Sequence, residues 1–158
     1  MKVLLIFVGK TSEKDIDNLI LKYADRLKHY NIGFSILTIP DLRNNKNMSR
    51  DQQKIMEGLS IYKLLTVNDT VILLDEHGKE RTSVDTATWL GKKMNTSTKR
   101  LVFIIGGPYG FSDKIYNRAN EMISLSKMTF SHQMVRVIFL EQLYRAMTII
   151  NNEPYHHN

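Results

Sequence analysis

The sequence predicts an α/β domain in which a mostly parallel sheet is flanked by helices. Short apolar runs rich in Val, Ile and Phe recur along the chain, and segments with a helical spacing of apolar residues separate them. Alternation of this kind is typical of a largely parallel sheet. The 158 residues suffice for one domain with a buried core, and no linker or internal repeat divides residues 1–158.

Strands are expected at the apolar runs of strand length. These runs occupy residues 3–8, 34–39, 70–74 and 101–105. The first run follows a single lysine, is too short for the core of a signal peptide and has no small-residue cleavage site after it. It is therefore predicted to be the first buried strand.

Helices are expected in the segments between and after these runs. They are predicted at residues 13–30, 49–65, 83–94, 114–122 and 133–150. Ser12 and Ser49 have the character of helix N-caps, and Ser83 is a weaker candidate of the same type. The Asn- and Lys-rich residues 43–47 are expected to form one surface loop.

The last predicted helix, residues 133–150, is apolar nearly all round, with residues that include Val135, Ile138, Leu143 and Ile149. A helix with so little polar surface has to be covered on more than one side. The sheet is expected to cover one side and a second copy of the chain the other. The sequence therefore predicts a homodimer.

The composition favours a cytoplasmic protein with an anionic partner. The formal net charge of +6 and the pI near 9.5 make nucleic acid the first partner to consider.

Cysteine is absent, so no disulfide, thiolate zinc ligand or cysteine nucleophile is possible. No apolar segment approaches the roughly 18 residues of a membrane span. The five scattered histidines, without cysteine, argue against a metal site.

A glycine-rich turn, IIGGPYGFS at residues 104–112, follows the fourth predicted strand. In open α/β sheets the carboxyl ends of the strands are where ligands bind. The alternative is a tight turn in which glycine supplies positive φ and Pro108 stiffness. Two nucleotide-binding motifs are excluded: the segment around Gly9 lacks the first glycine of a P-loop, and the spacing of Gly106, Gly107 and Gly110 is wrong for a dinucleotide fingerprint.

Two further segments are expected to join this turn in a pocket. Residues 75–79, with the sequence DEHGK, follow the third predicted strand, and residues 124–132 mix small, apolar and hydroxyl side chains without any strand or helix period. Three irregular loops that follow buried segments would form a pocket lined by backbone groups. Such a pocket suits a ligand with an adenine edge.

Several motifs in order resemble the ribosomal RNA large-subunit methyltransferase H family, a branch of the SPOUT methyltransferases. They are LDEHGK, IIGGPYG, SLSKMTFSHQMVR, EQLYRA and the closing PYH, and the resemblance covers essentially the whole chain. It implies an α/β domain with a C-terminal trefoil knot, a homodimer, and an enzyme that uses S-adenosylmethionine. The implied reaction is methylation of N3 of a pseudouridine in large-subunit ribosomal RNA. The knot is implied by the resemblance alone, since chains as a rule do not thread.

The resemblance also implies which residues contact the cofactor. They lie in the three segments singled out above and are Leu74, Gly106, Leu125, Ser126, Lys127, Met128, Thr129 and Phe130. Gly107 and Gly110 are expected to shape the turn. The chain departs from the family at Ser131, where proline is frequent, and at its end, where a basic residue often follows Tyr-His.

Methyl transfer needs an aligned nucleophile and an acceptor for its proton. The candidates for these tasks are His132, Arg136, Arg145, Tyr155 and His156. Arg136 has apolar neighbours along its predicted helix, so it is either a structural arginine or a contact to phosphate or base. His132 directly follows the cofactor segment, which favours a role on the substrate side over a capping role.

For Arg145 the alternative is a helical ion pair with Glu141, which is four residues away. Tyr155 and His156 follow the last helix, and the resemblance implies that this tail contributes to an active site across the dimer. Two other functions remain open: ribose 2′-O-methylation of transfer RNA, and nonenzymatic RNA binding in ribosome assembly.

Overall fold

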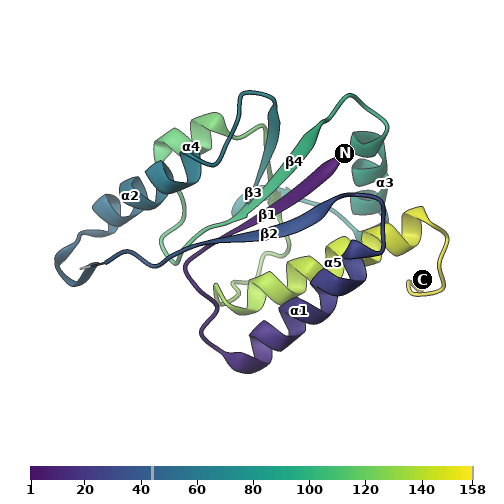
Figure 1. The fold of residues 1–158 in the computed structure, drawn as a ribbon, viewed down its shortest axis with the longest axis horizontal. Helices are drawn as coiled ribbons and strands as arrows, with labels where there is room; N and C mark the ends of the chain where they lie inside the picture. Colours follow the sequence, from purple (N-terminus) through teal and green to yellow (C-terminus); the bar gives the residue numbers. More distant parts are fainter. Residues whose placement is uncertain (44, 158) are drawn as a thin grey trace.

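A five-stranded parallel sheet forms the centre of the molecule. The computed structural model describes residues 1–43 and 45–157, and its strand order is β2-β1-β4-β3-β5. The strands are β1 (Lys2–Val8), β2 (Phe34–Ile39), β3 (Asp69–Glu80), β4 (Arg100–Ile105) and β5 (Glu121–Ser124). Every pair of neighbouring strands is parallel. The predicted α/β class and parallel sheet are confirmed (Figure 1).

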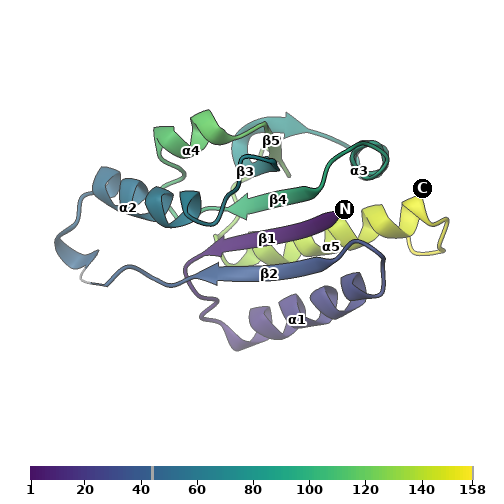
Figure 2. The same cartoon turned by 45° about the horizontal axis from the view of Figure 1, so that its top comes forward.

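Helices cover both faces of the sheet. They are α1 (Lys14–Lys28), α2 (Arg50–Tyr62), α3 (Ser83–Met94), α4 (Asp113–Arg118) and α5 (Met134–Ile150), with a 3-10 turn at Asn45–Asn47. Figure 2 shows α2 and α4 on one face and α1 and α5 on the other. None of the helices in the described part of the chain is long and apolar enough to cross a membrane.

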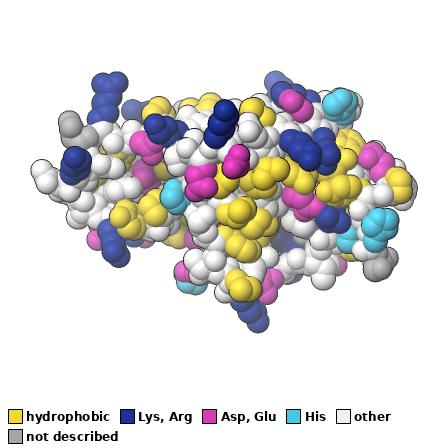
Figure 3. Space-filling view, turned by 90° about the horizontal axis from the view of Figure 1, so that it is seen from below, with side chains coloured by type: hydrophobic (Ala, Val, Ile, Leu, Met, Phe, Trp, Pro, Cys, Tyr) yellow, Lys and Arg dark blue, Asp and Glu magenta, His cyan; other side chains and the backbone are white. Residues whose placement is uncertain are grey.

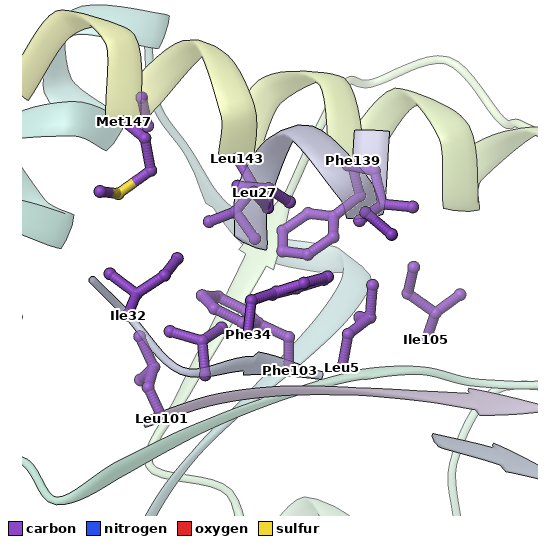
Figure 4. Close-up of a cluster of buried hydrophobic side chains, with 14 of the residues drawn as sticks. Leu5, Leu27, Ile32, Phe34, Leu101, Phe103, Ile105, Phe139, Leu143 and Met147 are labelled. Carbon is purple, nitrogen blue, oxygen red and sulfur yellow. The ribbon is translucent and has the colours of Figure 1, made fainter. Parts of the chain in front are cut away.

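The alternation of side chains along the strands divides the core between the two faces. On β1, Leu5 and Phe7 point into the cluster beneath α1, α3 and α5, whereas Ile6 points into the cluster beneath α2 and α4. Figure 4 shows how Phe103 of β4 and Phe139 of α5 meet in the larger cluster, with their ring centroids 4.9 Å apart. Buried aromatic area of this kind is a large part of what holds α5 on the sheet.

The third and fifth strands correct the prediction. The strand expected at 70–74 continues to Glu80, and the helix expected at 114–122 ends at Arg118, so that 121–124 form a strand. The reason is pairing between distant segments: Leu74 and Lys79 of β3 are both aligned with Ile123 of β5. Four residues are too few to show a strand period in the sequence, so tertiary pairing decides their conformation.

The helix starts were predicted with mixed success. Ser49 is confirmed as the N-cap of α2, because its hydroxyl accepts from the Gln52 N–H and the Gln52 side chain accepts from the Ser49 N–H. Ser12 is wrong, since α1 starts after Glu13 without a side-chain cap. Ser83 is wrong by one residue, because Thr82 caps α3. The loop expected at 43–47 contains a 3-10 turn, and its residue 44 lies outside the described residues.

Helix α5 is covered largely by its own chain. The prediction assigned one side to the sheet and the other to a second copy, but α1 and α3 pack along its flanks. Leu143 and Met147 are buried there, whereas Met134 is 44% exposed and Ile138 and Ile149 are half-buried. Figure 3 shows hydrophobic side chains gathered on the side of the molecule that carries α1 and α5.

An ion pair with a buried carboxylate ties β3 to β4 and to the turn that follows α2. The guanidinium of Arg100 donates to both carboxylate oxygens of Asp69, at 2.7 and 2.5 Å, and to the Leu64 carbonyl at 3.0 Å. The Asp69 side chain is 2% exposed. Burial by itself raises the pKa of Asp69, but the hydrogen bonds from Arg100 and from the Thr66 N–H outweigh it and lower the pKa.

We expect Asp69→Asn to lower the free energy of unfolding by about 2 kcal/mol at pH 7, because it leaves the partly exposed Arg100 without its partner. The folded-state pKa of Asp69 lies below the unfolded value of roughly 4, so the stabilisation is present above pH 4 and disappears as pH falls through the folded-state pKa. Urea titrations of both proteins at pH 7 and in strong acid measure the difference. An equal difference at both pH values would contradict this assignment.

Candidate functional site

A cavity of about 820 Å³ opens at the carboxyl end of β4 and beside the middle of β3. The turn after β4, the second half of β3 and the segment after β5 meet around it, as the sequence predicted. Eight of the predicted site residues line it: Leu74, Gly106, Leu125, Ser126, Met128, Thr129, Phe130 and His132. The structure therefore brings three distant segments to one place.

The glycine turn after β4 has both a structural and a pocket-lining role. Gly110 has φ +79° and its N–H donates to the Gly107 carbonyl at 3.3 Å, so a tight turn is present. Gly106 lines the cavity, yet a Cβ there would lie 3.0 Å from the buried ring of Phe111. A Cβ on Gly107 would lie 3.0 Å from the carboxylate of Glu57. The glycines thus make room for protein groups as well as for the cavity.

Outside this turn, Gly78 allows the backbones of β3 and β5 to approach closely. A Cβ at this position would lie 2.5 Å from the backbone N and C atoms of Ile123. No side chain fits between the two backbones, so only glycine permits the approach. The sequence predicted a loop at Gly78 and no separate role for this residue. Its place in the extension of β3 depends on pairing with β5, which the local sequence does not reveal.

A hydrogen-bonded acid sits at the cavity wall directly after the buried part of β3. The carboxylate of Asp75 accepts from the Tyr116 hydroxyl at 2.6 Å and lies 2.9 Å from Nδ1 of His77. Burial by itself raises the pKa of Asp75, but these hydrogen bonds outweigh it and lower the pKa. Burial, together with the bond to Asp75, raises the pKa of Tyr116 to about 12. The cavity wall therefore keeps a negative charge, which the local sequence did not predict.

Hydroxyl groups hold the segment after β5 in shape. The Ser124 hydroxyl donates to the Ser126 carbonyl at 3.0 Å, and the Ser126 hydroxyl accepts from the Met128 N–H at 2.9 Å. The Ser131 hydroxyl accepts from the Met134 N–H at 3.1 Å, at the start of α5. Lys127 is the one predicted cofactor contact that does not line the cavity within the described part of the chain.

Arg136 is fully buried and bonded within the chain. Its guanidinium donates to the Thr11 hydroxyl and to the Val8 carbonyl, both at 2.9 Å, and lies over the ring of Phe7 at 4.7 Å. Burial lowers its pKa, and the charge of Asp41 partly offsets this. These contacts fit the structural alternative, because they tie the end of β1 to α5. Among the described residues that line the cavity, Arg136 does not occur.

The tail after α5 packs on its own helix. The Tyr155 hydroxyl donates to the Glu141 carboxylate at 3.1 Å, and its ring meets the Tyr144 ring with centroids 4.8 Å apart. Burial and neighbouring groups, including Glu141, raise the pKa of Tyr155 to about 12. The predicted pair of Glu141 and Arg145 is confirmed, and Arg145 also approaches Nδ1 of His156 at 3.3 Å.

The tail and the cavity lie at opposite ends of α5. His132 precedes the helix, which has 17 residues, and Tyr155 follows it. A helix of that length spans about 25 Å at a rise of about 1.5 Å per residue. Figure 1 shows that the chain leaves α5 at the end remote from the turn after β4. Within one chain, Tyr155 and His156 are therefore separated from the other predicted site residues.

Comparison with known proteins places these features in a family. The family described as "Predicted SPOUT methyltransferase" matches residues 1–156. The chain is 60% identical over 157 residues to "Ribosomal RNA large subunit methyltransferase H" of Phocaeicola vulgatus, covering 99% of each chain. Proteins of the same description from Parabacteroides distasonis and Bacteroides fragilis are 58% and 57% identical, again with 99% of each chain covered.

Proposed function

Because the chain belongs to the SPOUT methyltransferases, and among them to the ribosomal RNA large subunit methyltransferase H family, we propose that it methylates large-subunit ribosomal RNA, with S-adenosylmethionine as methyl donor and N3 of a pseudouridine as acceptor. The cavity carries this proposal, since the segments that the resemblance assigns to the cofactor meet there. The net charge of +6 suits an RNA substrate.

The residues around the cavity fit S-adenosylmethionine. The cavity volume of about 820 Å³ lies within the range of roughly 300–1,000 Å³ that small-molecule sites usually have. Leu74 and Leu125 supply apolar surface, and the carboxylates of Asp75 and Glu76 complement positive charge. Leu74, Gly106 and residues 125–130 would hold the cofactor. When bound, it supplies a methyl group that is activated by the positive charge on its sulfur.

The chain's own residues then have two tasks. Transfer of a methyl group to N3 would leave the N3 proton in need of an acceptor. We assign proton acceptance or substrate positioning to His132, which is exposed and lines the cavity. Arg136 contributes by fixing the start of α5 against the end of β1, so that His132 and Val135 keep their places at the cavity.

The assembly that we propose is a homodimer in which each tail reaches the other chain's cavity. The distance of about 25 Å along α5 supports this, because Tyr155 and His156 lie far from their own cavity. The half-buried Ile138 and the exposed Met134 on α5 provide apolar surface for a second copy.

We take residues 1–158 as a single domain that works in the cytoplasm. We also propose that its C-terminal part forms a trefoil knot. Support for the knot comes from the irregular pairing of β3 with β5: Leu74 and Lys79 are both aligned with Ile123, so the residues between them leave the regular ladder beside the strand that precedes α5.

The decisive experiment supplies ribosomal particles from a strain that lacks the methylase, together with the purified protein and labelled S-adenosylmethionine. We expect label in large-subunit RNA, at N3 of a pseudouridine, when the modified nucleotide is mapped by mass. Label on a ribose of transfer RNA would instead support the 2′-O-methyltransferase. Calorimetry that detects no cofactor binding would favour the nonenzymatic assembly factor.

A further inference from the structure

An exposed tyrosine beside two basic residues forms part of the cavity lip. Tyr109 lies in the glycine turn, is 41% exposed and lines the cavity. The guanidinium carbon of Arg50 lies 5.1 Å from the centroid of its ring. Lys54, one turn further along α2, also lines the cavity. Arg50 is the first residue of α2, and Ser49 caps this helix. The backbone of Arg50 is therefore held by the capped helix start.

This combination is suited to single-stranded RNA. Proteins bind unpaired bases by stacking them on aromatic rings, and cationic side chains beside the rings contact the phosphates. A guanidinium on one face of a ring also holds that ring in place. Tyr109 therefore offers a flat, partly exposed surface at the entrance to the methyl-transfer cavity.

The charges at the lip favour the RNA over the cofactor as the partner of Tyr109. S-adenosylmethionine carries positive charge on its sulfur, and Arg50 and Lys54 repel positive charge while they attract phosphate. The carboxylates of Asp75 and Glu76, which suit a cation, belong to β3 instead. Lys54 lies 3.4 Å from Asp51, but the Asp51 side chain is 86% exposed, and exposed pairs of this kind are weak.

We propose that Tyr109 is the stacking platform for an unpaired base of the RNA substrate at the cavity, and that Arg50 and Lys54 contact the neighbouring phosphates. The inference rests on the proposed function and adds the residues that position the substrate. Tyr109 is a positioning residue: it acts on where the RNA lies and leaves the methyl donor untouched.

A matched control is available on the same helix as Arg50. Tyr62 is 43% exposed and has the ammonium of Lys114 4.1 Å from its ring centroid, so it resembles Tyr109 in exposure and in its cationic neighbour. Within the described part of the chain, Tyr62 does not line the cavity. If any exposed tyrosine with a cation served to bind RNA, the two residues would behave alike.

The test measures steady-state methylation of ribosomal particles that lack the modification. Tyr109→Ala is expected to raise KM for the particles roughly tenfold, with kcat and the cofactor Kd from calorimetry unchanged. Tyr109→Trp should restore KM, and Tyr62→Ala should leave it unchanged. Arg50→Ala should raise KM and weaken its dependence on salt. Thermal melting checks folding, and Tyr109→Leu provides a second variant without an aromatic ring.

Binding to an unstructured RNA oligonucleotide is measured in parallel, because it does not depend on turnover. If the unaltered protein methylates no ribosomal particle, the proposed function fails, and the oligonucleotide measurement alone decides the role of Tyr109. The inference is overturned if Tyr109→Ala binds RNA as tightly as the unaltered protein. An altered cofactor Kd in Tyr109→Ala, or an equal loss in Tyr62→Ala, would overturn it as well.

Discussion

A chain that ends at Pro154 is expected to transfer methyl groups about a hundredfold more slowly than the full chain while it binds S-adenosylmethionine equally well. The truncation removes Tyr155 and His156, which the proposed dimer places at the partner's cavity. A stacked aromatic ring is worth about 1–3 kcal/mol in single-strand binding, and loss of alignment adds to the effect. Single-turnover methylation and calorimetry measure the two quantities.

The stability cost of this truncation should be small. Within one chain the tail contributes the contact between the Tyr155 and Tyr144 rings and the approach of His156 to Arg145, both at the edge of the molecule. Tyr155→Phe is the matched control for stability, because it keeps the ring on Tyr144 and loses only the hydrogen bond to Glu141. Full methylation by the truncated protein would exclude the tail from the site.

Complementation distinguishes action within one chain from action across the dimer. Gly106→Val provides a partner chain with a damaged cavity, since even its Cβ lies 3.0 Å from the Phe111 ring and its two methyl groups need further room. Mixed dimers of this chain with the truncated chain should regain part of the activity, because one cavity and one tail remain intact. A monomer mass in light scattering, or verified mixed dimers without activity, would contradict a shared site.

Gly78→Ala is expected to lower the free energy of unfolding by about 3 kcal/mol or more, or to prevent folding. The added carbon would lie 2.5 Å from the backbone of Ile123, and both strands are held in place by their pairing. The added carbon should push β3 and β5 apart. Because β5 leads into the cofactor segment at 125–130, this displacement should also weaken cofactor binding. Urea titration and calorimetry measure both effects.

The matched control is Gly91→Ala, which makes the same chemical change inside α3. There the added carbon would meet only the side chain of Ile150, at 3.9 Å, which is an ordinary contact. Alanine in a helix interior is favoured over glycine by about 0.5–1 kcal/mol, so this variant should be as stable as the unaltered protein or slightly more so. Equal urea midpoints for the two variants would refute the close approach of β3 and β5.

Much of the fold could be predicted from local pattern. The strand at 34–39 and the helix at 83–94 have the predicted bounds, and β1 and β4 differ from the prediction by one residue at their starts. These elements carry their own apolar periodicity, so neighbouring residues suffice to specify them. The cavity-lining segments were also predictable, because the carboxyl ends of parallel strands meet at one edge of the sheet.

Tertiary structure alone decided the remaining features, because each depends on groups far apart in the sequence. The strand Glu121–Ser124 exists through its pairing with β3, and Gly78 is required by a backbone 45 residues further along the chain. Arg136 finds its partners at Val8 and Thr11, more than 120 residues earlier. Arg50 and Tyr109 are also far apart in the sequence and are brought together by the folded chain. The local pattern of residues indicates which side chains are apolar. Which group pairs with a buried charge, and which backbones approach each other closely, depends on how the whole chain packs.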